Sequence, residues 1–477
     1  MPYFLANIDL FFVFVIIHIF FFAFFLIFAQ IYCLMELQQL YTYYLQSKAV
    51  TTDTRTCTFG SMFFALRGER FDGNAYAWQA LEAGCSYAVV DDPHLPHLND
   101  PRMLLVDNTL KALQQLAHYH RMQLGIRIIG ITGTNGKTTT KELIAAVLSR
   151  RFCTHYTHGN LNNAIGVPLT LLQLTTEHEI AVVEMGASHP GDIRELVELV
   201  EPDMGIITNV GHAHLQGFGS FEGVIRTKGE LYDYLRGRSD TSIFLHADNP
   251  HLCSIAEGLP AIRYGRSDSA NGPLSVSGEV AACDPFLTFR WHDGASSTPW
   301  YTVKTHLVGQ YNIDNALCAV TVGRHLDINP EEINLAISCY QPTNSRSQLI
   351  QTEHNTLIVD AYNANPTSMR ASLDNFRNMK AAPKIVMLGD MKELGIASID
   401  EHSSIIRWLQ DCPFDMIWLI GPEFTQAAVL CNDVTRFRLF SSADEVIAAF
   451  QENKPEGYTI LIKGSNSMHL STLIPYL

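Results

Sequence analysis

The sequence lacks the cysteine pairs that would indicate a zinc site or a disulfide framework. Its ten cysteines occur singly between Cys33 and Cys431, with no Cys-x-x-Cys spacing, which is typical of a reducing compartment. Charged residues are also scarce, at 17%, and the formal net charge is -15. Because a negative surface repels a phosphate backbone, we expect no nucleic-acid partner. Basic groups that bind an anionic ligand must therefore be gathered locally.

Basic residues are absent from residues 1–47, which complicates the interpretation of an apolar leader. Residues 10–29 read LFFVFVIIHIFFFAFFLIFA, a run long enough to cross a bilayer, yet a signal peptide would begin with basic residues. Met35 opens MELQQLYTYYLQ, which predicts the first helix of a folded domain. Residues 1–34 are interpreted as a mis-assigned extension ahead of a start at Met35, as a membrane anchor, or as a core helix. Without an anchor we expect a cytoplasmic protein.

No internal repeat or low-complexity tract follows residue 34, and 477 residues are too many for a single core. Short apolar runs alternate with helical patterns, which predicts an α/β protein with mostly parallel sheets. We expect three domains: a small α/β domain at 35–125, a central doubly wound domain at 126–342 and a Rossmann-like α/β domain at 343–477. Residues 265–305, rich in Gly, Ser, Pro and Thr, predict an antiparallel extension of the central sheet.

The segment GITGTNGKTTT, residues 130–140, joins an apolar strand to a helix and has the features of a phosphate-binding loop. Its glycines let backbone amides close around phosphate oxygens, and the helix N-terminus adds partial positive charge. Lys137 would neutralise phosphate charge, and the Thr138 hydroxyl would bind Mg²⁺. The usual motif has glycine where Ile131 stands, so a turn without a ligand is the alternative. The predicted nucleotide contacts are Thr132, Gly133, Thr134, Asn135, Gly136, Lys137 and Thr138.

Polar residues also follow the next strands of the predicted central sheet. Glu184, in VVEMGAS, ends a buried strand. Ligands of an open α/β sheet gather at this edge, and a carboxylate there suits a metal. His212 and His214, in TNVGHAHLQGFGS, are candidate ligands after the following strand. The asparagines of NLNNAIGVP, residues 160–168, are either loop caps or ligand contacts.

Together these stretches resemble the Mur ligase family, the ATP-dependent enzymes that add amino acids to the peptidoglycan precursor. The resemblance covers residues 35–477. The phosphate loop is similar to the family's own version, including the displaced first glycine, and EMGAS, NVGHAHL, TKGELYD, HLVGQYNIDNALCA and LIVDAYNANPTSM follow in the family's order. DAYNANPTSM (360–369) and MLGDMKELG (387–395) are most similar to the branch that joins D-alanyl-D-alanine to UDP-N-acetylmuramoyl-tripeptide.

The resemblance implies ATP, Mg²⁺ and those two substrates, and it implies a reaction through an acyl phosphate. A carboxylate is a poor electrophile until its oxygen becomes part of a good leaving group. The negative charge that accumulates would be stabilised by Mg²⁺, Lys137 and backbone amides. The first domain would bind the UDP-linked peptide. We expect a monomer.

The resemblance also implies two Mg²⁺ ions, with Thr138 and Glu184 on one and His212 on the other. Lys228, in IRTKGE, matches a lysine that the family uses as a carbamate, which converts a cation into an anionic oxygen ligand. Residue chemistry alone indicates a solvated lysine or a phosphate contact at this position. Lys137, Lys228 and His212 are therefore the expected catalytic residues.

Further contacts are expected from the same resemblance. Asn312 and Asn315 match a motif beside the adenine, and they also lie one helical turn apart, so both can face one ligand. Arg346 and Asp360 match residues that reach the γ-phosphate and the ribose. Lys463 is either a substrate contact or part of a turn. The expected substrate contacts are Thr52, Asp53, Arg55, Asn160, Asn163, Asn363 and Asn365.

Three alternatives share parts of this pattern. Two are other ligases of the same architecture: the enzyme that adds the third amino acid and a folate polyglutamylating enzyme. The Tyr-Asn-Ala-Asn-Pro stretch at 362–366 and the UDP-binding type of first domain argue against both. A nucleotide-driven switch would use the same loop but needs no cleft between three domains. Because ATP must meet third-domain residues, we expect a hinge near 341–348 and closure on ligand binding.

Overall fold

The computed structural model describes residues 37–266, 273–294, 298–431 and 435–477. The chain divides into two compact units, Met1–Gly125 with Leu171–Gln173 and Ile126–Thr170 with Leu174–Leu477. Within the described ranges, no helix has the length and apolar character that a membrane span requires. The apolar leader at residues 1–34 lies outside the described residues.

The first unit contains a small parallel sheet. Residues 37–45 form the expected helix, and the four strands have the order β1-β2-β5-β6. Apolar side chains from the central strands and from α2 form its core. A second helix, α3, begins after Asn108, whose side chain accepts the Lys111 N–H. The elements are β1(Val50–Thr51), β2(Met62–Phe64), α2(Ala77–Glu82), β5(Tyr87–Val90), β6(Met103–Leu105) and α3(Thr109–Leu124).

The second unit is built on a nine-stranded sheet of order β15-β14-β13-β12-β11-β10-β7-β9-β8. The strands from β13 to β8 run parallel to their neighbours, whereas β13, β14 and β15 form an antiparallel extension, as predicted. The mostly parallel α/β class is confirmed. The strands are β7(Arg127–Thr132), β8(Thr154–Tyr156), β9(Ile180–Glu184), β10(Met204–Ile207), β11(Ser242–His246), β12(Ala261–Arg266), β13(Val276–Cys283), β14(Phe286–Asp293) and β15(Tyr301–Val308).

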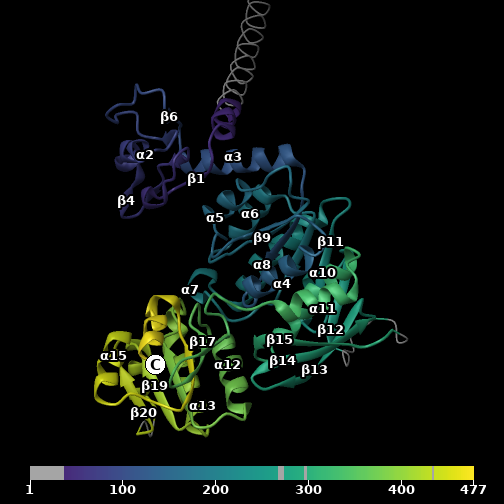
Figure 1. The fold of residues 1–477 in the computed structure, drawn as a ribbon, viewed down its shortest axis with the longest axis vertical. Helices are drawn as coiled ribbons and strands as arrows, with labels where there is room; N and C mark the ends of the chain where they lie inside the picture. The colour runs from purple at the N-terminus through teal and green to yellow at the C-terminus, as the bar shows by residue number, and fades with distance from the viewer. Residues whose placement is uncertain (1–36, 267–272, 295–297, 432–434) are drawn as a thin grey trace, which may run out of the picture. The chain divides into compact units, whose positions relative to one another are not determined.

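Two packed helices, α4(Lys137–Leu148) and α10(Asn312–His325), position the phosphate loop over this sheet. Figure 1 shows them beside α11(Pro330–Cys339), which also packs against α4. The apolar residues of α4 recur on one face, and α10 is buried on most sides. Leu143 and Val147 of α4 belong to the same core as Leu317 of α10. Because α10 is held by this core, its N-terminus has a fixed place near the loop.

A third sheet, of order β16-β17-β21-β18-β19-β20, follows the central one. Alternate residues of β18 face two different cores: Val386 and Leu388 pack with α12, α13 and α14, while Ile385 and Met387 pack with α15. The sheet is therefore covered on both faces, as a parallel sheet requires. The elements are β16(Gln348–Gln351), β17(Thr356–Asp360), α12(Pro366–Asn378), β18(Lys384–Gly389), α13(Ser398–Gln410), β19(Met416–Ile420), α14(Pro422–Val429), β20(Phe437–Phe440), α15(Ala443–Glu452) and β21(Thr459–Lys463).

We predict that Leu317→Ala destabilises the central sheet and its helices by roughly 2–5 kcal/mol, because Leu317 is fully buried and its removal leaves a cavity. Urea unfolding followed by tryptophan fluorescence measures the change. The control is Leu335→Ala on α11, where the side chain is 51% exposed and the expected change is within about 0.5 kcal/mol. Equal effects of the two substitutions would contradict the packing described for α10.

Candidate active site

The loop between β7 and α4 has the backbone that phosphate binding requires. Gly133 has a φ of 141° and Gly136 a φ of 78°, both in the region that favours glycine. A Cβ at Gly133 would lie 2.0 Å from the Thr208 hydroxyl, and one at Gly136 would lie 2.5 Å from Oδ1 of Asn315. The loop therefore has no room for side chains at these two positions.

Two residues at the end of β10 hold the loop in this shape. The Asn135 N–H donates to Oδ1 of Asn209 at 2.9 Å, and the Thr208 hydroxyl donates to the Asn135 carbonyl at 2.7 Å. Sequence analysis missed both residues, because it used the TNVGHAHL stretch only for its histidines. Their place directly after a strand, at the ligand edge of the sheet, was the available signal.

The Lys137 side chain curls back over the loop. Its ammonium donates to the carbonyl oxygens of Gly133 at 2.8 Å and Thr134 at 3.1 Å. Burial lowers the pKa of Lys137 to about 8, Glu184 opposes this shift, and Arg346 adds to it. Glu184 compensates the positive charge of this ammonium only in part. A bound phosphate would supply the remaining negative charge.

Glu184 ends β9 with its side chain almost completely buried, at 1% exposure. The Thr138 hydroxyl donates to its carboxylate at 3.0 Å, and the Asn162 amide donates at 2.8 Å. The Lys141 ammonium lies 3.6 Å from the same carboxylate. Burial alone raises the pKa of Glu184, but Lys141 and two further cations outweigh it, so the pKa lies below its ordinary value. Glu184 is an ionised carboxylate in dry surroundings.

Lys141 and Asn162 are a second pair that sequence analysis missed. Asn162 lies between two asparagines that were predicted as substrate contacts, Asn160 and Asn163, and these two are exposed. Oδ1 of Asn163 accepts backbone N–H groups from Ile165 and Gly166, so it caps a turn. The spacing of four between Lys137 and Lys141, which places both on one face of a helix, was the signal for Lys141.

The residues around Thr138 and Glu184 fit Mg²⁺. The Thr138 hydroxyl and the Glu184 carboxylate are oxygen ligands in direct contact, and Mg²⁺ is commonly held by one or two carboxylates together with substrate phosphates. In the part of the chain that the structure describes, no three His, Cys, Asp or Glu side chains form a complete metal cage. The remaining ligands would come from the nucleotide and from water.

Lys228 and His212 lie on or near α8(Phe221–Arg236). Lys228 is buried, and its ammonium lies 3.5 Å from the Ala187 carbonyl oxygen. Burial holds the pKa of Lys228 well below its ordinary value, and Lys137 lowers it further. The His212 ring packs against Phe221 at 4.8 Å between centroids. A buried amine of lowered pKa is not the solvated lysine that residue chemistry alone suggested.

Asn312 and Asn315 are buried and connect α10 to α4. The Asn315 amide donates to Oδ1 of Asn312 at 2.9 Å, and its own Oδ1 accepts the Thr140 hydroxyl at 3.0 Å. The Asn312 amide donates to the Val308 carbonyl oxygen. Both side chains thus fix the helix beside the phosphate loop, and their contact with adenine stays a prediction.

The segment that leads into the third sheet is attached to α4. The Tyr340 hydroxyl and the Asn344 amide both donate to Glu142, the amide at 3.0 Å. Ser345 and Ser347, with φ of 55° and 52°, follow in the left-handed region. The predicted hinge at 341–348 therefore has one end bonded to the helix that begins at the phosphate loop.

Arg346 extends from this segment toward the loop. Its guanidinium lies 3.8 Å from the centroid of the Tyr362 ring, and its Nε is buried without a hydrogen-bond partner. It lowers the pKa of both Lys137 and Glu184, so it lies close to the loop. The unpaired Nε–H could donate to an anion.

Asp360 and Lys463 end neighbouring strands and form an ion pair of 2.6 Å. Lys463 is 1% exposed, so it is not simply part of a surface turn. Asn365 caps α12, and its amide also donates to Oδ1 of Asn135 in the phosphate loop at 2.8 Å. Asn363 is exposed, and its Oδ1 accepts the Ala364 N–H.

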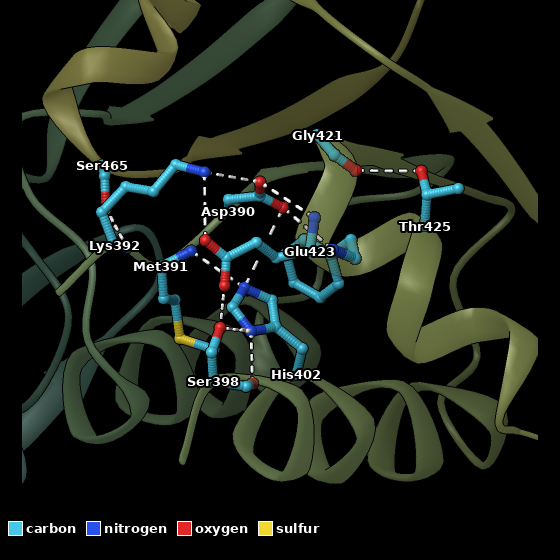
Figure 2. Close-up of polar contacts among 10 residues, drawn as sticks. Asp390, Met391, Lys392, Ser398, His402, Gly421, Glu423, Thr425 and Ser465 are labelled. Carbon is cyan, nitrogen blue, oxygen red and sulfur yellow. Dashed lines mark hydrogen bonds and ion pairs between the residues drawn. The ribbon is translucent and has the colours of Figure 1, made fainter. Parts of the chain in front are cut away.

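The MLGDMKELG stretch forms a polar cluster after β18, shown in Figure 2. The Lys392 ammonium donates to Asp390 at 2.9 Å and to Glu423 at 3.2 Å. Asp390 is fully buried and accepts the Phe424 N–H at the start of α14. His402 accepts the Met391 N–H below them. This network fixes the loop at the carboxyl edge of the third sheet.

In the first unit, the predicted uridine or diphosphate contacts lie in one turn. Asp53 accepts the Arg55 N–H at the start of a short 3-10 helix, and the two side chains form an ion pair of 2.6 Å. Thr52 lies beside them in the sequence. The Arg55 side chain is 88% exposed, so it is accessible to a ligand.

We predict that Gly136→Ala weakens nucleotide binding roughly tenfold or more, because the added Cβ would meet Asn315 in addition to straining the backbone. Isothermal titration with ATP measures the affinity. Gly159→Ala is the matched control, since Gly159 also has a positive φ but has no atom within 4 Å of its Cβ position. Unchanged affinity in the Gly136 variant would show that the loop does not hold the nucleotide.

Comparison with known proteins finds one family along most of the chain. Three family models match: the Mur ligase family catalytic domain at 46–121, the Mur ligase middle domain at 131–323 and the Mur ligase glutamate ligase domain at 345–466. The chain is 34% identical over 433 residues to the UDP-N-acetylmuramoyl-tripeptide--D-alanyl-D-alanine ligase of Bacillus subtilis, covering 89% of this chain and 92% of that protein. The Escherichia coli enzyme of the same name is 32% identical over 443 residues, with the same two coverages.

Solved structures show the same fold. A crystal structure of MurF from Acinetobacter baumannii superposes with a TM-score of 0.79 at 32% identity and covers 92% of this chain and 97% of its own. MurF from Thermotoga maritima in complex with ADP has a TM-score of 0.77 at 23% identity, covering 91% and 97%. The chain belongs to the Mur ligase family.

Proposed function

We propose that this protein is an ATP-dependent ligase that joins D-alanyl-D-alanine to UDP-N-acetylmuramoyl-tripeptide in peptidoglycan precursor synthesis. The relatives that bear this activity in their names align with about nine tenths of the chain. The observation that carries the proposal is the charge around the buried carboxylate Glu184, on which Lys137, Lys141 and Arg346 act beside the phosphate loop. Such a surplus of positive charge suits a triphosphate.

The reaction has two steps. A carboxylate oxygen of the tripeptide attacks the γ-phosphorus of ATP, and ADP leaves, so the carboxylate becomes an acyl phosphate. The dipeptide amine then attacks the carbonyl carbon and loses a proton. Inorganic phosphate leaves with the original carboxylate oxygen. Lys137 and Arg346 would stabilise the charge on the transferred phosphoryl group, since fixed cations in a dry site act without reorganisation.

Thr138 and Glu184 would hold one Mg²⁺, and His212 with Lys228 a second. The ions neutralise phosphate charge when bound. An ammonium cannot bind a cation, so Lys228 would first react with carbon dioxide. Its neutral amine attacks the carbon, a proton is released, and the resulting carbamate is an anionic oxygen ligand. Burial lowers the pKa of Lys228 and so favours the neutral amine that this step needs.

The remaining predicted contacts would serve the organic substrates. Asn312 and Asn315 would lie beside adenine, and Asp360 beside the ribose. Thr52, Asp53 and Arg55 would bind the uridine diphosphate part, and the third sheet would bind the dipeptide. The need for ATP favours a cytoplasmic enzyme, and we propose a monomer without nucleic-acid partners.

An isotope experiment tests the acyl phosphate. The tripeptide substrate is labelled with ¹⁸O in its terminal carboxylate, and the released phosphate is examined by mass spectrometry. We expect labelled phosphate that appears only when both organic substrates are present. Unlabelled phosphate released at the same rate without them would instead indicate a nucleotide-driven switch.

Substitution of Lys228 tests the carbamate. Lys228→Ala should lose activity by roughly 100-fold or more, because a metal ligand at the phosphoryl group disappears. Acetate or another short carboxylic acid should restore part of the rate by filling the space with an anionic oxygen ligand. Lys111→Ala, at an exposed position of α3, is the control and should be unaffected by acetate. Full activity of the Lys228 variant would rule out the carbamate.

A further inference from the structure

Lys141 is an unusual residue for the place where it lies. It is 0% exposed, although it carries a long and ordinarily charged side chain. Its ammonium is buried without a hydrogen-bond partner. Lys141 is thus neither at the surface nor part of a hydrogen-bond network. The charged and aromatic groups around its ammonium must therefore account for its burial.

The carboxylate nearest to the Lys141 ammonium is Glu184. The ammonium lies 3.6 Å from Oε2 of Glu184 and 3.9 Å from Oε1 of Glu142. Glu142 already accepts hydrogen bonds from Tyr340 and Asn344. The ammonium also lies 5.8 Å from the centroid of the Tyr156 ring, where a cation is favoured. Lys141 is thus held beside Glu184 by the packing of α4.

Hydrogen-bond donors and cationic side chains of the protein surround the Glu184 carboxylate. Thr138 and Asn162 donate hydrogen bonds to it, and Lys141 supplies a positive charge. Lys137 and Arg346 act on it as well. Together these groups bring more positive than negative charge to the space where a cation would approach.

A free divalent cation would therefore be repelled from this carboxylate at short range and in low dielectric. A triphosphate reverses the balance, because it brings several negative charges and further oxygen ligands. We propose that Lys141 is a built-in counter-ion of Glu184 that makes divalent-metal binding at this site depend on bound nucleotide. The role is one of positioning and rests on Glu184 being a metal ligand, as in the proposed function.

Manganese binding without turnover tests this inference. Free Mn²⁺ is measured by electron paramagnetic resonance at a fixed pH, with and without a non-hydrolysable ATP analogue. The variants are Lys141→Met, which keeps the length but removes the charge, Lys141→Arg, which keeps the charge, and Glu184→Gln. Lys111→Met is the matched control for loss of a lysine charge at an exposed position.

The wild-type chain should bind Mn²⁺ through Glu184 only with the analogue. Lys141→Met should bind Mn²⁺ without nucleotide at least ~10-fold more tightly than wild type, and adding Glu184→Gln should abolish that gain. Lys141→Arg and Lys111→Met should behave as wild type. If circular dichroism shows that the Met variant is unfolded, Lys141→Gln takes its place.

Two results would overturn the inference. One is a Glu184-dependent Mn²⁺ site in the wild-type chain without nucleotide. The other is a folded charge-removing variant with no gain in Mn²⁺ affinity. A different result separates this inference from the proposed function: if Glu184→Gln leaves Mn²⁺ binding with the analogue unchanged, Glu184 is not a metal ligand and the proposed metal arrangement itself is wrong.

Discussion

The geometry of the candidate active site depends on one buried carboxylate, Glu184, whose pKa lies below its ordinary value. Glu184 is removed from water at the end of β9, which disfavours its charge, and only the cations and hydrogen-bond donors gathered around it reverse that effect. These groups come from different parts of the chain, including α4, the 160–168 loop and the segment before the third sheet. Interactions with this carboxylate therefore bring elements that are distant in sequence together beside the phosphate loop.

Much of the fold was predictable because its elements follow simple patterns. The apolar runs at 128–131, 180–183 and 385–388 are buried on both faces, and such runs are characteristic of parallel strands. Two short strands of the third sheet, β16 and β20, were not predicted. Both lie at the edges of that sheet and are partly exposed, so their sequences lack a continuous apolar run.

A motif singles out Lys137 and Thr138 in the sequence, and their contacts with nucleotide and metal stay predictions. Residues that act only through their neighbours are harder to find from sequence. Thr208 and Asn209 shape the loop through hydrogen bonds to Asn135, and their place directly after a strand is the signal that the sequence offers for them. Lys141 was overlooked because a lysine on a helix is normally exposed. Its burial depends on tertiary packing, which the sequence does not show.

The bonds from Tyr340 and Asn344 to Glu142 have a consequence for motion between the second and third sheets. They attach Tyr340 and Asn344 to α4, so the expected hinge would narrow to residues 345–347, where Ser347 is itself hydrogen-bonded to Tyr311. A pivot of so few residues would sample few orientations, so little conformational entropy would be lost if the third sheet moved into a reactive position. Such a tether would lower the entropic cost of assembling a site from separate parts.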